Sequence, residues 1–457
     1  MLPRFLEHVR SKGLIDAAKP TLVGYSGGPD STCLLHLMHV GGFDVIAAHL
    51  HHGQREEADK EMSLCEAFCN ELGVPFLSGR ADVPRIAASL KVGLEEAGRM
   101  ARYDFFDSAA NATEVGAIAT AHTRDDQVET VLLNLVRGTG LTGLAGIPER
   151  RGRIVRPLLP FSRSETQAYC KEHGLWTHDD PANTDLSFSR ARVRHEVSPA
   201  LRHINEDYAE AILRLSEIAK SEDEFLNGMA AAALEKSEIS LNGELNFLTR
   251  DNEITFNRDL LLHLPSVLLK RALRLATLAV GGALDHNQTT IAELGCRTGR
   301  PGSITCEGGD VRIEWSANEV TARLTKPTPP FRSNLTVPGE TISDEMNWAL
   351  TAEYAPMPRG SLPRASLEAY LAATTTKGLL YFRNWKPGDE MRPLGFSGRR
   401  KLADLMSEAS LTANAKARLP LVCDMLGPLW APGVCVDERC RAEEGSKVLS
   451  LSFRALV

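Results

Sequence analysis

The strongest constraint on the fold is a short glycine loop that lies between an apolar segment and a helical one. Residues 21–25, TLVGY, are typical of a buried strand, and residues 31–40, STCLLHLMHV, are typical of a helix. Glycines let the backbone approach an anion without a Cβ clash, and a helix N-terminus presents unpaired N–H groups. The order of strand, loop and helix therefore predicts a phosphate site made by Ser26, Gly27, Gly28, Pro29, Asp30 and Ser31.

The same strand–helix order continues along roughly the first 190 residues. After the helix at 31–40 come a strand-like FDVIAAHL, a helix-like EEADKEMSLCEAFCNEL and a strand-like VPFLSG. Residues 95–111 are again helical in pattern, and VGAIATAH is typical of another buried strand. Strands that alternate with helices predict a parallel sheet with crossover helices, so we expect an α/β domain over 1–200.

The remainder of the chain predicts a different organisation. Apolar residues recur every three, four or seven positions between 200 and 235, which is the pattern of one long amphipathic helix. Together with a small α+β unit, this helix makes a connector and middle domain over 201–325. The proline-rich KPTPPFRSNLTVPG opens a linker expected over 326–375. Short strands and turns then predict a small β-rich domain over 376–457.

Length and composition exclude several classes of protein. The 457 residues exceed the about 250–300 at which a single core stops growing, and 43% hydrophobic residues exclude a mainly disordered chain. A net charge of −7 argues against a polybasic protein that coats nucleic acid. Nine scattered cysteines without a CxxC pair fit a reducing compartment. Because we find neither an apolar export segment nor a long apolar run, we expect a cytoplasmic protein.

A second group of polar residues follows the last predicted strand of the first domain. His122, Asp126 and Glu129 are spaced four and three apart, so a helix places them on one face, beside Asp125. Carboxylates crowded in this way suit Mg²⁺ or a cationic amine, whereas this spacing is less typical of zinc. A capped helix start, with Thr123 as the N-cap, is the structural alternative, and capping is compatible with a function.

Basic residues gather in local groups although the whole chain is acidic. Arg137, followed by four glycines within ten residues, forms a loop that favours anions. Such groups predict local phosphate-binding surfaces, and the alternative is solvated surface arginine. The groups are Arg150, Arg151, Arg153 and Arg156; Arg190, Arg192, Arg194 and His195; and Arg399, Arg400 and Lys401.

The phosphate loop carries the first resemblance to a known family. The chain has no GxxxxGK[ST] motif, so the loop is not a Walker A loop. Its SGGxDS pattern resembles the PP-loop of the N-type ATP pyrophosphatases. That group cleaves ATP between the α- and β-phosphates and activates a substrate as its adenylate. The plain alternative is a Ser/Gly turn that Asp30 and Ser31 cap at a helix start.

A second resemblance is more specific. AHTRDDQVETVLLNLVRGTGLTGLAGIP, at 121–148, resembles the motif of the tRNA(Ile)-lysidine synthase family. The likeness covers most of the chain and is weakest over 235–375. His51 stands where many members carry Asn or Asp, and Ala191 stands where many carry Asn. Further segments resemble the family in order along the chain: AHLHHGQR at 48–55, GLEEAGRMARYDFF at 93–106, RPLLPFSRSE at 156–165, DDPANTDLSFSRARVRH at 179–195 and RNWKPGDEMRPLGFSGRRKLADLM at 383–406.

This resemblance implies an ATP-dependent ligase that works in two steps. The C2 carbonyl oxygen of the wobble cytidine, in a tRNA(Ile) with a CAU anticodon, attacks the α-phosphate of ATP, and pyrophosphate leaves. The amine of free L-lysine then displaces AMP at C2, which gives lysidine. The implied partners are this tRNA and lysine, and the implied cofactors are ATP and Mg²⁺. A homodimer is also compatible with the sequence.

The resemblance and the chemistry of the side chains together give each candidate a role. The 26–31 loop binds ATP, and Asp30 and Asp126 hold Mg²⁺. Residues 376–457 are expected to grip the tRNA. The catalytic candidates are Asp30, Asp126, Glu129 and Arg102. Lysine and tRNA are expected to meet Glu95, Asp125, Arg137, Arg190, Arg192, Arg194 and His195.

Two other functions stay open from the sequence. A PP-loop tRNA sulfurtransferase is the nearest alternative, although such enzymes usually need paired cysteines or an iron–sulfur cluster, and this chain has no CxxC. A non-catalytic nucleotide- or RNA-binding module would have lost Asp30 or the acidic group, and both are intact. Pyrophosphate that appears only in the presence of tRNA would separate these functions.

Overall fold

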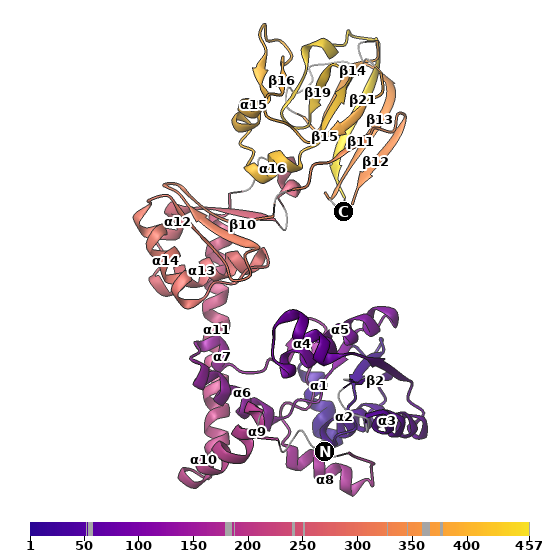
Figure 1. The fold of residues 1–457 in the computed structure, drawn as a ribbon, viewed down its shortest axis with the longest axis vertical. Coiled ribbons are helices and arrows are strands. Elements are labelled where there is room, and N and C mark those ends of the chain that lie inside the picture. Colours follow the sequence, from indigo (N-terminus) through magenta and orange to yellow (C-terminus); the bar gives the residue numbers. More distant parts are fainter. Residues whose placement is uncertain are drawn as a thin grey trace. The chain divides into compact units, whose positions relative to one another are not determined.

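The chain divides into two compact units, Met1–Glu224 and Phe225–Val457 (Figure 1). Within the residues described, none of the helices combines the length and the apolar character that crossing a membrane requires. The motif segments at 48–55 and 179–195 lie partly outside the described residues. The computed structural model describes residues 1–51, 53, 58–178, 185–186, 188–239, 243–249, 252–326, 328–344, 346–358, 366–374 and 378–456.

Unit 1 is built on a six-stranded sheet in the order β3-β2-β1-β4-β6-β5. All neighbouring pairs are parallel except β5 with β6, which confirms the predicted α/β class with a mostly parallel sheet. The strands predicted at 21–25 and 115–122 correspond to β1 and β4. The strands are β1 (Thr21–Gly24), β2 (Val45–His51), β3 (Phe76–Arg80), β4 (Ala117–Ala119), β5 (Arg150–Arg151) and β6 (Ile154–Val155).

Helices cover both faces of this sheet. Side chains alternate across a strand, so Val23 packs with one group of helices and Leu22 with the other. The Val23 face carries residues of α1, α2, α3 and α8, and the Leu22 face carries residues of α5. The helices of unit 1 before its last one are α1 (Leu2–Ser11), α2 (Pro29–Val40), α3 (Ala58–Leu72), α4 (Val83–Leu90), α5 (Leu94–Ala112), α6 (Arg124–Arg137), α7 (Leu141–Leu144), α8 (Arg163–Glu172), α9 (Ser189–Arg192) and α10 (Ser198–Ile204).

The strand order creates a switch point beside β1. From β1 the chain runs outward through β2 to β3, and it then returns to β4 on the other side of β1. The loops that leave the carboxyl ends of β1 and β4 therefore lead away in opposite directions, and ligands of open α/β sheets bind at such points. The phosphate loop leaves β1, and residues 120–123 leave β4 toward α6. Two motifs that are distant in the sequence thus reach one edge of the sheet.

The predicted long amphipathic helix is confirmed as α11 (Tyr208–Ser237). It begins later than residue 200, because Asn205 is extended and ends the short helix α10. In Figure 1, α11 is one continuous helix, and its residues belong to both units.

Unit 2 starts with a small α+β part, as predicted for the middle domain. Its four-stranded antiparallel sheet has the order β7-β10-β9-β8. Trp315, Leu273 and Ala292 share its core, so helices pack on the sheet. The elements are β7 (Glu253–Asn257), α12 (Arg258–Leu262), α13 (Ser266–Ala279), α14 (His286–Thr298), β8 (Gly302–Thr305), β9 (Val311–Trp315) and β10 (Glu319–Leu324).

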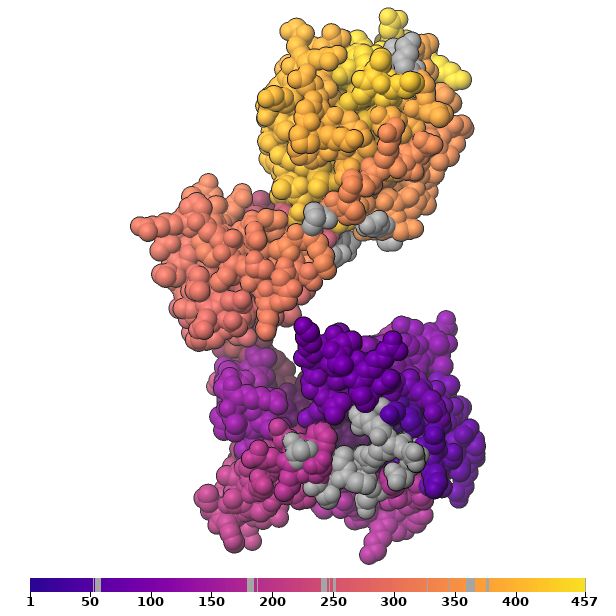
Figure 2. All heavy atoms as spheres, in the orientation of Figure 1, coloured from indigo at the N-terminus to yellow at the C-terminus, as the bar shows by residue number. Residues whose placement is uncertain are grey.

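The rest of unit 2 is β-rich, and here the structure differs from the predicted linker. Strands of the 326–375 stretch pair with strands that lie much later in the chain, because β13 and β14 flank β21 and β11 pairs with β15. In Figure 2 the orange atoms of this stretch lie against the yellow atoms of the C-terminal residues. The two sheets have the orders β11-β15-β18-β19-β20 and β12-β13-β21-β14.

One core joins these strands. Trp348 and Trp430 are almost fully buried in it. The elements are β11 (Arg332–Asn334), β12 (Gly339–Ser343), β13 (Trp348–Pro356), β14 (Glu368–Ala372), β15 (Tyr381–Arg383), β16 (Glu390–Met391), β17 (Arg400–Lys401), α15 (Leu402–Glu408), α16 (Ala413–Arg418), β18 (Leu421–Asp424), β19 (Gly427–Ala431), β20 (Cys435–Val436) and β21 (Lys447–Ala455).

Candidate active site

The phosphate loop lies at the carboxyl end of β1, where the chain turns into α2. Gly27 has a φ of +78°, and a Cβ at this position would lie 3.0 Å from the Cys65 Sγ. Gly28 is the extended N-cap of α2 and has no side chain, which leaves the first N–H groups of the helix for an anion. The Ser31 hydroxyl donates to the Gly28 carbonyl (3.0 Å) and accepts from the Ser26 N–H (3.2 Å). These bonds hold the loop in shape.

Helix α6 begins after β4 with a capping box. Asp126 Oδ2 accepts from the Thr123 N–H (2.8 Å) and from the Thr123 hydroxyl (2.9 Å). Asp126 is 9% exposed, and Glu129, one turn later, is 3% exposed. The cap uses only one oxygen of Asp126 and leaves Oδ1 for a second partner. The capping alternative and a charged role therefore occur together.

His122 lies just before this cap and is a neutral ring. Its Nδ1 is 3.0 Å from the Thr120 Oγ1. Burial lowers the pKa of His122 to about 4, and Arg156 and Arg190 act in the same direction. At neutral pH, His122 is therefore a polar but uncharged neighbour of the helix that carries Asp126 and Glu129.

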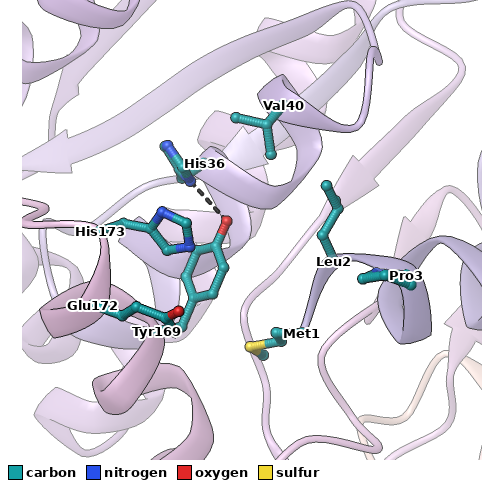
Figure 3. A pocket seen from close by; sticks show the side chains of 8 residues that line it. All are labelled: Met1, Leu2, Pro3, His36, Val40, Tyr169, Glu172 and His173. Carbon is teal, nitrogen blue, oxygen red and sulfur yellow. Dashed lines mark hydrogen bonds between the residues drawn. The ribbon is translucent and has the colours of Figure 1, made fainter.

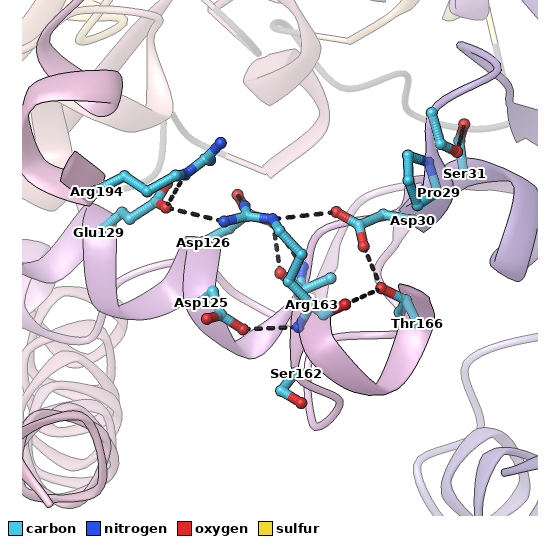
Figure 4. A network of polar contacts seen from close by, with 12 residues as sticks. Pro29, Asp30, Ser31, Asp125, Asp126, Glu129, Ser162, Arg163, Thr166 and Arg194 are labelled. Atoms are coloured by element: carbon cyan, nitrogen blue, oxygen red, sulfur yellow. Dashed lines mark hydrogen bonds and ion pairs between the residues drawn. The ribbon is translucent and has the colours of Figure 1, made fainter. Parts of the chain in front are cut away.

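Arg163, the first residue of α8, is the centre of the site. Its Nη2 donates to Asp126 Oδ1 (3.0 Å), and its Nη1 donates to Glu129 Oε1 (3.2 Å). Its Nε lies 3.5 Å from Asp30 Oδ2. Figure 4 shows the guanidinium between these three carboxylates. The backbone N–H of Arg163 also donates to Asp125 Oδ2 (2.8 Å), so Asp125 holds the start of α8.

The charges in this cluster stabilise one another. Burial acts against the charge on Arg163, but Asp126, Glu129 and Asp30 outweigh it and raise the pKa of the guanidinium. Burial likewise acts to raise the pKa of Asp126, but Arg163 and other neighbours, among them the hydrogen bonds from Thr123, together outweigh it, so this pKa lies below its usual value. Asp126 and Arg163 are therefore both ionised at neutral pH.

Asp30 differs from Asp126 in its electrostatics. Its Oδ1 accepts from the Thr166 hydroxyl, one turn along α8 from Arg163. Burial raises the pKa of Asp30, although Thr166 and Arg163 act in the opposite direction. Asp30 is thus a partly buried carboxylate beside the phosphate loop, where a further cation would stabilise its charge.

The predicted basic group at 190–195 divides into inward and outward residues. Arg194 Nε and Nη2 donate to the two oxygens of Glu129 (2.8 and 3.2 Å), which joins this residue to the cluster. Arg192 is exposed and pairs with Glu196 (3.4 Å), and His195 is also exposed. Ala191, which departs from the family pattern, is buried.

Three other predicted residues lie at the surface. Glu95 is exposed in the first turn of α5, and Arg102 is exposed farther along the same helix. Arg137 is exposed in the last turn of α6. Among the described residues, no hydrogen bond or ion pair joins Glu95 or Arg137 to the carboxylates around Arg163. The structure therefore places Glu95 and Arg137 outside the network.

The histidines at the end of β2 lie near the loop. His49 Nδ1 is 3.0 Å from the Tyr25 carbonyl oxygen, and burial lowers the pKa of its ring. His51, which departs from the family pattern, is 6% exposed and accepts from the Gly53 N–H (3.0 Å). His52 lies outside the described residues.

The donor set fits a magnesium ion that arrives with its nucleotide. In the described part of the chain, no three His, Cys, Asp or Glu side chains converge on a metal position. Mg²⁺ usually takes one or two carboxylates and completes its shell with water and substrate phosphates. Burial raises the pKa of Asp30, and its carboxylate adjoins the phosphate loop, where it could reach such an ion. Asp126 belongs to the same network through Arg163.

A cavity of about 340 Å³ lies elsewhere on α2 and α8 (Figure 3). His36 Nδ1 lies 2.9 Å from the Tyr169 hydroxyl at its edge. None of the predicted site residues lines it. The cavity is lined by Met1, Leu2, Pro3, His36, Val40, Tyr169, Glu172 and His173.

Sequence reasoning missed Arg163 and Thr166 as members of the site. The segment RPLLPFSRSE contributed to the family resemblance, and its Ser-x-x-Glu pattern is a capping box that begins a helix. That signal places Arg163 at the start of α8. It does not say that this helix start faces the switch point of the sheet.

Two families match parts of the chain. Residues 4–201 match the family described as PP-loop domain, and residues 380–453 match the family described as TilS substrate C-terminal domain.

Similar proteins span nearly the whole chain. The tRNA(Ile)-lysidine synthase of Dehalococcoides mccartyi is 31% identical over 99% of this chain and 99% of that protein. The tRNA(Ile)-lysidine synthase of Geobacillus kaustophilus is 31% identical over 95% of each. Among solved structures, the U34-tRNA thiolase NcsA of Methanococcus maripaludis is 16% identical, with 48% of this chain and 79% of that chain covered and a TM-score of 0.41.

Proposed function

This chain belongs to the tRNA(Ile)-lysidine synthase family, and we propose that the family's reaction takes place at the carboxyl ends of β1 and β4. The protein is an ATP-dependent ligase that modifies tRNA. The observation that supports this site is that Arg163 joins the phosphate loop, through Asp30, to the acidic helix, through Asp126 and Glu129. The activation chemistry and the lysine chemistry then share one site.

The first step needs a nucleotide held in place and its charge neutralised. The C2 carbonyl oxygen of the wobble cytidine bonds to the α-phosphorus of ATP, and the bond to the bridging oxygen breaks as pyrophosphate leaves. The 26–31 loop would hold the phosphates through backbone N–H groups and the hydroxyls of Ser26 and Ser31. Asp30 and Asp126 would hold Mg²⁺, which when bound neutralises phosphate charge. Arg102, exposed on α5, is assigned to the pyrophosphate.

The second step needs lysine bound with its reacting amine deprotonated. The amine nitrogen bonds to C2, the C2–O bond to AMP breaks, and the amine loses a proton. Asp126 and Glu129 are assigned to hold the amine by charge and to accept that proton. Glu95 is exposed on α5, and Arg137 is exposed in the last turn of α6. Both are assigned to the remaining charged groups of lysine.

The tRNA is assigned to basic residues of both units. Arg192 and His195 are exposed, and Arg190 and Arg194 lie beside them in sequence, so this segment suits RNA phosphates. We also propose that residues 1–200 form the catalytic domain, 201–325 the connector and middle domain, and 376–457 the tRNA-binding domain. The last of these is best tested by surface substitutions, because its strand β21 pairs with β13 and a truncation would break that sheet.

The function is tested by measuring pyrophosphate with purified protein, ATP, Mg²⁺ and a tRNA(Ile) transcript with a CAU anticodon. We expect pyrophosphate release that requires the tRNA, and AMP release that requires lysine as well. Release of pyrophosphate without any tRNA would contradict the assignment. A product that gains sulfur when a sulfur donor is supplied would replace it with a PP-loop sulfurtransferase.

A further inference from the structure

We propose that Arg163 is a positioning residue for both steps, because its single guanidinium holds the carboxylates of Asp30, Asp126 and Glu129 in one arrangement. This inference rests on the proposed function and adds to it a residue with no assigned role. Arg163 need not touch ATP, lysine or RNA for this. It acts on the three side chains that do.

The geometry uses each nitrogen of the guanidinium differently. Nη2 donates to Asp126 (3.0 Å), Nη1 donates to Glu129 (3.2 Å) and Nε lies 3.5 Å from Asp30. A guanidinium is planar and presents its N–H groups as a fixed fork, so three carboxylates bound to it have fixed relative positions. A lysine ammonium at the same position would be a point charge and could not impose this arrangement.

The three carboxylates come from two helices that lie far apart in the sequence. Asp30 lies in the first turn of α2, after the phosphate loop, whereas Asp126 and Glu129 lie on α6. Like charges repel strongly where water is excluded, and Glu129 is 3% exposed. Without a cation between them, these side chains would separate or take up protons. Arg163 therefore couples the nucleotide loop to the acidic helix.

Two hydrogen bonds hold the first turn of α8 in place and so fix the position of Arg163. The Arg163 N–H donates to Asp125 (2.8 Å), and the Thr166 hydroxyl donates to Asp30. The Arg163 side chain is 21% exposed, so it is partly shielded from water that would weaken its ion pairs. Arg194 cannot replace it, because its two bonds go only to Glu129.

The test compares variants of Arg163 and one control variant with the wild type in the lysidine reaction. In Arg163→Met the cation is lost and the volume is kept, so we expect kcat to fall about 100-fold in both steps, with little change in the KM for ATP. Arg163→Lys keeps the charge and is expected to recover only part of this loss. Arg124→Met is the matched control, because Arg124 begins α6 but pairs with Glu210 on the exposed surface (2.8 Å). It is expected to keep the wild-type rate.

Chemical rescue separates positioning from general damage to the fold. Arg163→Ala leaves space for a free guanidinium ion, so millimolar guanidinium chloride is expected to raise its kcat. Urea has the same shape without the charge, and at the same concentration it should not raise kcat. The wild type and Arg124→Met should not respond to either compound. Circular dichroism and thermal melts establish that each variant is folded.

The outcomes distinguish this role from the function itself. A wild type that makes no lysidine overturns the proposed function and this role with it. An active wild type with an equally active, folded Arg163→Met overturns only the role, as does an Arg163→Ala variant that guanidinium fails to rescue. Should Arg163→Met fail to fold, Arg163→Lys decides, because a wild-type rate in that variant contradicts the need for a forked cation.

Discussion

Helices α2 and α8 meet in two places that differ in chemistry. At the first turns of both helices, Asp30 accepts from Thr166 and is ion-paired with Arg163. Farther along, His36 and Tyr169 share a neutral hydrogen bond of 2.9 Å beside the 340 Å³ cavity. The first place lies at the switch point of the sheet and at helix N-termini, and the second does not.

The proposed site lies at the first of these places, away from the cavity. A large cavity is a common first guide to an active site. Here the cavity is lined by none of the residues that the phosphate loop and the acidic helix bring together. Charge that is gathered at strand ends and helix N-termini is the better guide, because these places bind phosphates.

The largest expected effect comes from the first place, where Asp30 is ion-paired with Arg163. Asp30→Asn removes the charge but keeps the shape, so adenylation should fall on the order of a thousand-fold. Pyrophosphate release from a tRNA transcript measures this effect. A folded variant that still releases pyrophosphate at the wild-type rate would show that Asp30 is not needed for adenylation. The two places would then not differ in function.

A smaller effect is expected from the hydroxyl that holds Asp30. Thr166→Val removes one hydrogen bond to a charged group without a change in size, so adenylation should fall about ten-fold. The same pyrophosphate assay measures it. Equal losses in adenylation and in lysine transfer from adenylated tRNA would argue against an effect through Asp30 alone.

At the second place, where His36 contacts Tyr169, a substitution should change stability and not activity. Tyr169→Phe removes the hydrogen bond to His36, which lowers the free energy of unfolding by about 1 kcal/mol. Denaturant unfolding measures this loss. The rate of lysidine formation should stay at the wild-type level, and a clear decrease would mean that the second place also serves catalysis.

These contrasts also show how much the sequence alone could predict. The loop at 26–31, the parallel sheet and the buried pair Asp126 and Glu129 followed from local patterns, because periodicity and helix spacing are local properties. The central role of Arg163 did not follow, since it depends on where α8 begins relative to β1 and β4. The spacing of residues in the sequence does not predict this spatial arrangement.

The exposure of Glu95 and Arg137 and the strands of the 326–375 stretch depend on packing that local sequence patterns do not describe. Glu95 and Arg137 have suitable charges, but only packing decides whether a residue of α5 or of the end of α6 faces inward. The stretch 326–375 is rich in proline, so its sequence resembles a linker. Its strands β13 and β14 pair with β21, far along the chain, and β11 pairs with β15.

The smallest predicted effect concerns pH and the His122 ring. Its pKa is about 4 in the fold and 6.5 in an ordinary setting, so between these values the unfolded chain binds the extra proton. The free energy of unfolding should therefore decrease as pH falls from 6.5 to 4. His122→Asn should flatten this slope in denaturant titrations at several pH values, and an unchanged slope would contradict a ring that is neutral in the fold.

The central claim is that the ionic meeting of α2 and α8, and not the cavity, is where lysine is joined to the tRNA. The most direct measurement incubates wild type, Asp30→Asn and Tyr169→Phe with ATP, Mg²⁺, lysine and the tRNA, and then weighs the wobble nucleoside. The account predicts a gain of one lysine minus one water with wild type and Tyr169→Phe, and unmodified cytidine with Asp30→Asn. Lysidine from Asp30→Asn, or its loss only in Tyr169→Phe, would contradict it.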